Sequence, residues 1–153
     1  MIINSVTIEN FRCYSGISNI NFNNKGKITL IYGDSGFGKS SFLQFFRWMF
    51  YGDPDFGKDN DKPLFNIADY SKKKPGDKIK VAGKIDFDHL GVKYSLIKEV
   101  YYDYAINPNN ARVFKTEYSL QHLINDSWQR FNGDIPNKIN NHVLLFKILH
   151  APP

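Results

Sequence analysis

The chain has 153 residues, of which 42% are apolar and 16% aromatic, so it can bury one hydrophobic core and is expected to be a single globular domain. Its 20 basic and 15 acidic residues give a net charge of +5 at pH 7, which favours a polyanionic partner. It has no run of 18 apolar residues and no signal-peptide pattern at its start, so we expect a cytoplasmic protein with no membrane partner. The single cysteine, Cys13, excludes an internal disulfide and is expected to be a partly buried thiol.

The first 51 residues predict strands followed by a helix. Apolar residues in 2–8 and again in 17–22 predict two strands, and KITLIY at 27–32 predicts a third. Residues 39–51, KSSFLQFFRWMFY, predict a helix with large apolar side chains nearly all round it. We expect that helix to be buried on most sides, and we interpret its aromatic residues as core packing rather than as a surface for stacking bases.

A phosphate-binding motif lies between the third strand and the helix. Residues 33–40 read GDSGFGKS, a complete G-x-x-x-x-G-K-S/T pattern. Its glycines allow successive backbone N–H groups to point inward, and the dipole of the following helix adds positive potential at the same place. A glycine-rich turn that only caps a helix does not need the lysine and serine. The expected nucleotide-binding residues of this loop are Gly33, Asp34, Ser35, Gly36, Phe37, Gly38, Lys39, Ser40 and Ser41.

Three side chains of the motif have specific expected roles. Lys39 is placed to reach the β- and γ-phosphates of ATP, and Ser41 to donate to the α-phosphate. The Ser40 hydroxyl is expected to complete the shell of a Mg²⁺ ion. The predicted cofactors are therefore ATP and Mg²⁺.

The rest of the chain predicts a loop, an antiparallel layer and a helical end. Residues 53–77 are rich in Gly, Asp, Asn, Lys and Pro and predict a long surface loop with room for a helical turn. In 78–119 apolar residues alternate, which predicts a hairpin around His89 to Gly91 and a third strand over 111–118. Residues 120–150 are expected to be mostly helical, with one apolar face over 134–149.

Lysines are frequent after residue 71 and have two interpretations. The run Lys72, Lys73 and Lys74 is either a solvated loop or a contact to the phosphate backbone of DNA. Together with Lys78, Lys80 and Lys84 it could form a basic ridge. Alternating lysines on a hairpin also protect an edge strand from pairing with another chain.

Three segments carry a resemblance to a known family. IENFRCY at 8–14, ITLIYGDSGFGKSSFLQFFRWMFYG at 28–52 and HLGVKYSLIKE at 89–99 resemble the N-terminal lobe of the SMC, SbcC and RecN group of ABC-type ATPases, especially its DndD-like members in DNA modification and phage defence. The resemblance implies an α/β fold, a P-loop NTPase lobe with an antiparallel β-layer, over residues 1–153. It also implies that Arg12, which follows an aromatic residue at the end of the opening strand, lies near the bound nucleotide.

The sequence lacks several motifs of that family that ATP hydrolysis requires. A glutamine loop, a signature motif and an apolar strand ending in Asp-Glu are not evident in its sequence. We therefore expect Mg-ATP binding with little or no hydrolysis by this chain alone, and a C-terminal lobe or a second ATPase head as its partner. The alternative is a non-catalytic interaction module that pairs with a separate ATPase lobe or with a full-length relative. A small phosphotransferase is a weaker interpretation, because such enzymes follow the loop with parallel βαβ units.

Overall fold

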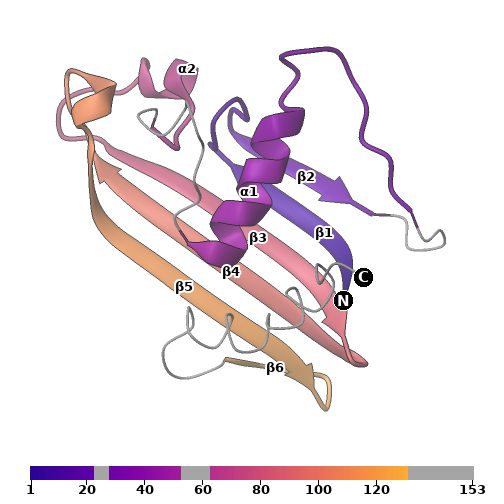
Figure 1. Ribbon diagram of the computed structural model, residues 1–153. Helices are drawn as coiled ribbons and strands as arrows, with labels where there is room; N and C mark the ends of the chain where they lie inside the picture. Colours follow the sequence, from indigo (N-terminus) through magenta and orange to yellow (C-terminus); the bar gives the residue numbers. More distant parts are fainter. Residues whose placement is uncertain (23–27, 53–62, 131–153) are drawn as a thin grey trace.

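The computed structural model describes residues 1–22, 28–52 and 63–130. Within these residues the chain forms a six-stranded antiparallel sheet in the order β2-β1-β3-β4-β5-β6, and α1 lies across one of its faces (Figure 1). None of the described helices is long and apolar enough to cross a membrane. The elements are β1 (Ile2–Glu9), β2 (Ile17–Asn21), α1 (Lys39–Tyr51), α2 (Ile67–Tyr70), β3 (Lys78–His89), β4 (Val92–Asp103), η2 (Pro108–Asn110), β5 (Arg112–Ile124) and β6 (Ser127–Arg130).

The hairpin of β3 and β4 is the centre of the sheet. The two strands pair without interruption from Lys78 opposite Asp103 to His89 opposite Val92. Their two-residue turn, Leu90-Gly91, has φ of 49° and 79°, the left-handed values that a tight hairpin turn requires. The alternation in the sequence therefore predicts this hairpin correctly.

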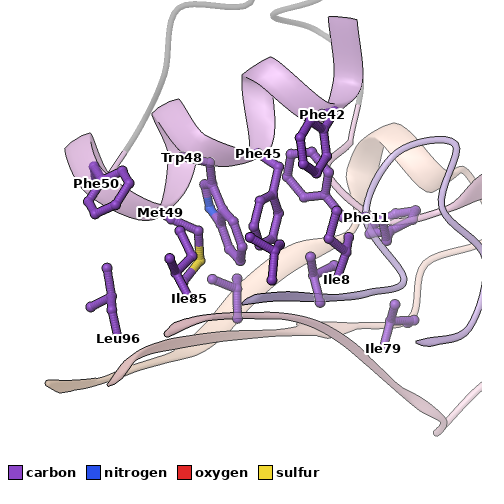
Figure 2. Packing of buried hydrophobic residues seen from close by; sticks show 14 of the residues in the cluster. Ile8, Phe11, Phe42, Phe45, Trp48, Met49, Phe50, Ile79, Ile85 and Leu96 are labelled. Atoms are coloured by element: carbon purple, nitrogen blue, oxygen red, sulfur yellow. The ribbon is translucent and has the colours of Figure 1, made fainter. Parts of the chain in front are cut away.

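The core lies between α1 and the sheet (Figure 2). Phe45, Trp48 and Met49 of α1 are each at most 1% exposed. They contribute to one buried cluster with apolar residues of the strands below, among them Ile8 and Ile85. Burying side chains of this size contributes roughly 2 kcal/mol each, which makes the packing of α1 a main source of stability.

The helix has one exposed side, contrary to the expectation of burial on most sides. Leu43 and Tyr51 are 65% and 58% exposed, and Arg47 is also exposed. The buried positions, 42, 45, 48, 49 and 50, face the sheet. Because only one layer of β-structure covers α1, one side of its apolar circumference has no covering element among the described residues.

A buried lysine contacts the C-terminal end of α1. Lys98 is 2% exposed, and its ammonium donates hydrogen bonds to the carbonyl oxygens of Trp48 at 3.0 Å and Gly52 at 2.7 Å. The same ammonium lies 4.4 Å from the centre of the Trp48 ring. Carbonyl groups at a helix C-terminus lack intrahelical partners and carry partial negative charge, so Lys98 both caps α1 and fixes it to β4.

The lysines of β3 do not form an unpaired basic ridge. Lys78, Lys80 and Lys84 lie on the sheet face opposite α1 and contact carboxylates of Asp103, of Glu9 and Glu99, and of Asp86 respectively. The edge-protection interpretation is also wrong, because β3 lies between β1 and β4 and is not an edge strand. Lys78 and Lys80 pair across neighbouring strands, where opposite charges stabilise an antiparallel sheet, and Lys84 pairs with Asp86 two residues along β3.

Two predicted elements differ from the structure. The sequence predicts a strand over 27–32, but residues 28–32 form no strand. They run away from the sheet and back to the start of α1 (Figure 1). Apolar alternation alone does not make a strand, because its backbone groups need a partner strand. The helical character expected from 120 is also wrong as far as residue 130, where β5 continues to Ile124 and turns into β6. The helix expected over 134–149 lies outside the described residues.

Candidate functional site

The motif residues form an open turn that leads into α1. Gly36 and Gly38 have φ of 89° and 86°, left-handed values that glycine adopts without strain. Gly38 is the N-cap residue of α1, and no side chain caps the helix. The first N–H groups of a 13-residue helix thus point out of its N-terminus without a side-chain acceptor, together with the positive end of the helix dipole. This is the arrangement that binds phosphate groups in proteins.

Lys39 folds back over the turn. Its ammonium donates hydrogen bonds to the carbonyl oxygens of Gly33 and Asp34, both at 2.7 Å. Two of its three N–H bonds therefore stabilise the curvature of the loop, and one remains for an anion at the helix N-terminus. Lys39 is the first residue of α1, so the motif carries one full positive charge at the start of the helix with the uncapped N–H groups.

The serines that follow Lys39 differ in exposure. Ser40 is exposed and Ser41 is half-buried at the edge of α1. The described residues contain no group of three His, Cys, Asp or Glu side chains that could hold a metal ion. A Mg²⁺ ion at Ser40 fits this setting only as an ion held mainly by phosphate oxygens and water, which is how Mg²⁺ usually binds with nucleotides. The remaining predicted loop residues, Gly33, Asp34, Ser35 and Phe37, are exposed in the same turn.

The turn between β1 and β2 lies directly against the motif. A Cβ atom added at Gly38 would come within 2.7 Å of the Cys13 sulfur, so only glycine fits there. The Tyr14 hydroxyl donates to the Gly38 carbonyl at 3.3 Å. Partial burial, and to a smaller extent the Cys13 thiol, raises the pKa of Tyr14, which keeps this hydroxyl protonated as a donor. Cys13 is exposed rather than partly buried, because it lies at the surface of this contact.

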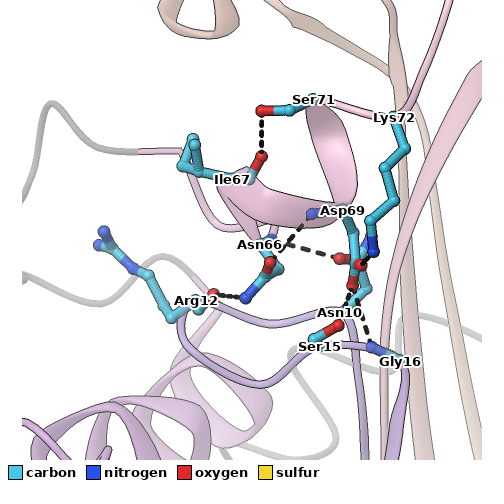
Figure 3. Close-up of polar contacts among 9 residues, drawn as sticks. All are labelled: Asn10, Arg12, Ser15, Gly16, Asn66, Ile67, Asp69, Ser71 and Lys72. Carbon is cyan, nitrogen blue, oxygen red and sulfur yellow. Dashed lines mark hydrogen bonds and ion pairs between the residues drawn. The ribbon is translucent and has the colours of Figure 1, made fainter.

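Arg12 is held beside the motif by an unusual backbone conformation. Its φ is 52°, which is uncommon for a residue other than glycine. Two hydrogen bonds hold it there: its N–H donates to the Leu64 carbonyl at 2.6 Å, and the Asn66 side chain donates to its carbonyl at 2.7 Å. Figure 3 shows the Arg12 side chain pointing away from this anchor. Next to it Phe11, which is fully buried, forms a bridge with Phe65 and packs on Trp48.

Asp69 of α2 fixes the other side of the same turn (Figure 3). Its carboxylate accepts hydrogen bonds from the Ser15 hydroxyl at 2.7 Å and the Gly16 N–H at 3.0 Å. Lys72 contacts the other carboxylate oxygen at 3.0 Å. The hydrogen bond from Ser15, followed by those from Lys72 and Gly16, lowers the pKa of Asp69 from 3.8 to about 2. The charged form of Asp69 therefore stabilises the native contact between α2 and the β1–β2 turn.

Replacing Asp69 is expected to change the pH dependence of stability. Because its folded pKa lies below the ordinary value, the stabilisation is complete above pH 3.8 and is lost as the pH falls toward 2. Asp69→Asn should lower the free energy of unfolding at pH 7 by about 1 kcal/mol, since this surface site is well solvated. Urea unfolding between pH 7 and pH 3 measures the difference, which should shrink at the acid end. Asp126→Asn, at an exposed turn, is the control and should show neither effect; an Asp69→Asn difference independent of pH would contradict the prediction.

Arg12 and Ser41 line one cavity of about 460 Å³. Gln44 of α1 and Asn109 of η2 contribute to the same cavity, together with the apolar residues Phe65 and Ile67. The structure thus brings two predicted site residues together with two amide side chains that the sequence analysis does not identify. Asn109 stands in a stretch, NPNN, whose only sequence signal is that of a turn.

The lysine run, Lys72 to Lys74, follows α2 and is far from the motif in the sequence. Lys72 is paired with Asp69, whereas Lys73 and Lys74 are exposed in the turn before β3. The Lys74 N–H donates to the Asp77 carboxylate at 2.9 Å, which fixes this turn. Two of the three predicted DNA contacts are therefore accessible cations, and the third is partly neutralised.

The comparisons with known proteins agree with this geometry at the level of the family. A comparison with curated proteins finds no match. The sequence pattern of the AAA domain family matches residues 5–148, which include the motif, α1 and all of the described sheet except the first three residues of β1. That family consists of ATPase-type nucleotide-binding modules, in line with the uncapped helix N-terminus and the folded-back Lys39. The chain belongs to the AAA domain family.

Proposed function

We propose that the chain is the ATP-binding lobe of an SMC-like ATPase that acts on DNA in the cytosol, in repair, DNA modification or phage defence. The observation that carries the nucleotide part is the Lys39 ammonium, which the Gly33 and Asp34 carbonyls hold at the uncapped N-terminus of α1. The finer assignment, a P-loop lobe of the SMC, SbcC and RecN group, is supported by the resemblance of 8–14, 28–52 and 89–99. A net charge of +5 is consistent with a polyanionic partner.

The positions of the acidic residues support binding without efficient hydrolysis. The chain has only three glutamates, Glu9, Glu99 and Glu117, and no Asp-Glu pair. Strand alternation and the register put all three on the sheet face opposite α1, where each contacts a lysine. None of them can position a water molecule at the motif. Hydrolysis under this proposal therefore depends on groups that a second lobe supplies.

Residues 28–32 support a partner that completes the fold. Ile28, Leu30 and Tyr32 are 89%, 80% and 87% exposed, and the segment belongs to none of the strands of the described residues. An exposed apolar segment that pairs with no strand of the described residues is a template for an added strand. We propose that a C-terminal lobe or a second ATPase head provides it. The same exposed segment favours the second candidate, a non-catalytic module that pairs with a separate ATPase lobe.

Contact of DNA with Lys72, Lys73 and Lys74 remains a prediction. The two exposed cations, Lys73 and Lys74, form no ion pair with another described residue, and such cations bind phosphates by releasing counterions. Binding at this turn would therefore weaken as the salt concentration rises.

Native mass spectrometry with and without Mg-ATP tests the proposal. We expect the purified chain to gain the mass of one Mg-ATP per subunit, because the anion site is formed within one chain. A parallel assay of phosphate release should show hydrolysis close to the uncatalysed rate. A chain that keeps its fold but gains no nucleotide would contradict the ATP-binding proposal, and rapid turnover would contradict the need for a second lobe. Nucleotide-independent pairing with a separate lobe would favour the non-catalytic module.

A further inference from the structure

The turn between β1 and β2 contains a strained arginine. Arg12 has a φ of 52° and Asn10 a φ of 55°, both in the left-handed region. Asparagine adopts such values more readily than most residues, because its short side chain can bond to the nearby backbone, whereas arginine rarely does so. Strained residues persist only where the surrounding structure holds them, and they cluster at functional sites. Contacts from elsewhere in the chain must therefore hold Arg12 in place.

Asn66 supplies contacts that hold this turn (Figure 3). Its side-chain N–H donates to the Arg12 carbonyl at 2.7 Å, and its backbone N–H donates to the Asn10 carbonyl at 3.1 Å. Asn66 is 7% exposed, so water competes little for these hydrogen bonds. The Arg12 N–H donates to the Leu64 carbonyl at 2.6 Å, which completes a short pairing between the two segments.

The acceptor half of the Asn66 carboxamide has a separate use. Its Oδ1 accepts from the Asp69 N–H at 3.1 Å, which makes Asn66 the N-cap residue of α2. Capping requires only a side-chain oxygen, which serine and aspartate provide as well as asparagine does. The donor half is what joins the start of α2 to Arg12. Only one of the two uses of Asn66 can therefore be taken over by another N-cap residue.

The Arg12 side chain lies on the side of the turn that meets α1. Figure 3 shows it pointing away from Asn66, and its Nε atom is buried. Arg12 lines the same cavity as Ser41 and Gln44 of α1, and Ser41 belongs to the predicted phosphate-binding residues. A guanidinium is always charged and carries five N–H donors whose geometry matches phosphate oxygens. The anchored backbone of Arg12 thus places a cation beside the start of α1.

We propose that Asn66 is a positioning residue of the phosphate site, whose carboxamide holds Arg12 in the left-handed conformation from which the guanidinium contacts a bound polyphosphate. The inference rests on the proposed function, in which the phosphates of ATP bind at the N-terminus of α1. Asn66 does not itself touch the ligand. Holding Arg12 before the ligand arrives lowers the entropy cost of binding. Without the Asn66 amide, the φ of Arg12 returns to the negative values that arginine prefers, and the guanidinium is no longer directed to the site.

Asn66→Ser tests the donor half of the amide separately from the cap. Serine keeps a side-chain oxygen for α2, but its shorter side chain cannot also reach the Arg12 carbonyl. We expect Asn66→Ser to stay folded and to bind Mg-ATP about fivefold more weakly than the parent, measured by isothermal titration calorimetry on the full chain. Asn107→Ser is the matched control, since Asn107 is the N-cap residue of η2 in the β4–β5 connection, and it should bind Mg-ATP like the parent.

A double-mutant cycle with Arg12→Ala distinguishes positioning from a merely structural role. Arg12→Ala should weaken Mg-ATP binding about tenfold, the effect of a lost charged contact. Asn66→Ser should then add a loss of less than about twofold, because it acts through the Arg12 side chain. The dependence of affinity on NaCl concentration is a second readout. Asn66→Ser and Arg12→Ala should reduce it alike, since each removes the same contact between charges, whereas a loss of stability alone would leave it unchanged.

The outcomes separate this inference from the proposed function. If the folded parent does not bind Mg-ATP, the proposed function fails and the positioning role fails with it. If the parent binds, but Asn66→Ser or Arg12→Ala binds like the parent, the positioning role is overturned while the phosphate site stands. It is also overturned if Asn66→Ser weakens binding by the same factor with and without Arg12.

Asn66→Asp is the second variant, in case Asn66→Ser does not fold. It keeps the size of the side chain and the cap of α2, but it sets a carboxylate oxygen against the Arg12 carbonyl in place of the N–H donor. It should weaken Mg-ATP binding at least as much as Asn66→Ser, and parent-like binding would overturn the inference. Circular dichroism of each variant confirms that it is folded.

Discussion

Lys39→Ala is expected to weaken Mg-ATP binding strongly while the chain stays folded. The Lys39 ammonium is exposed and contacts two carbonyl groups of the loop, so its removal affects the motif and not the buried core. It supplies the only full positive charge within residues 33–41. Losing a charged partner of the phosphates should weaken binding by about 3 kcal/mol, roughly a hundredfold. Isothermal titration calorimetry with Mg-ATP measures the loss, and thermal unfolding checks that the melting temperature changes little.

Two controls define what this result means. Lys73→Ala removes an exposed lysine elsewhere and reports any effect of net charge alone, which should be less than twofold at physiological salt. Lys39→Arg keeps the charge but replaces the compact ammonium with a planar fork, so it should recover only part of the affinity. If Lys39→Ala bound Mg-ATP as tightly as the parent, residues 33–41 would not be the phosphate site.

Gly83→Val is expected to destabilise the whole domain. Gly83 lies on the α1 side of β3, and a Cβ atom there would come within 2.4 Å of the Met49 sulfur and 2.7 Å of the Phe45 ring. Both neighbours are fully buried, so neither can move without displacing α1 from the sheet. We expect a loss of about 3 kcal/mol or more in the free energy of unfolding, the upper range for overpacked cores. Urea unfolding followed by tryptophan fluorescence measures it, because Trp48 lies in the same cluster.

Lys84→Val is the matched control for Gly83→Val. It places the same side chain at the next residue of β3, on the opposite face, where Lys84 is 44% exposed and pairs with Asp86. A surface ion pair contributes little, so this variant should change the free energy of unfolding by about 0.5 kcal/mol or less. Gly83→Ala should lie between the two, since it adds the clashing atom but not the branches. A Gly83→Val chain as stable as the parent would show that α1 does not approach β3 as closely as the structure has it.

Local patterns in the sequence were sufficient for α1 and for the β3–β4 hairpin. The hairpin follows from alternating apolar residues on both sides of Leu90-Gly91, a turn whose geometry depends on its own two residues. The motif at 33–40 likewise predicts the positive φ of Gly36 and Gly38 and the start of α1, but it gives no sign of the contact between Gly38 and the β1–β2 turn. The same motif is the basis for predicting Lys39 and Ser41 as site residues, which the Lys39→Ala experiment tests.

Contacts between distant segments were beyond the reach of those patterns. The sequence predicts a strand over 27–32, but strand formation depends on a partner, and no described strand pairs with residues 28–32. Pairing also decided that β3 is an interior strand, so that Lys80 meets carboxylates of both neighbouring strands and does not protect an edge. In the sequence Lys98 is an ordinary strand lysine. In the structure its ammonium donates to the carbonyl of Gly52 at the C-terminal end of α1, 46 residues away in the chain.

The amino-acid sequence by itself determined the membership of the AAA domain family, the glycine conformations of the motif at 33–40 and the alternating β-layer, since each of these is encoded by patterns along the chain. The tertiary structure alone decided which side chains surround the motif. Asn66 holds Arg12 across a separation of 54 residues, and Asn109 lines the same cavity as Ser41. Such positions follow from how α1, α2 and the β4–β5 connection meet at one end of the sheet, which depends on packing between elements and not on the pattern within any one of them.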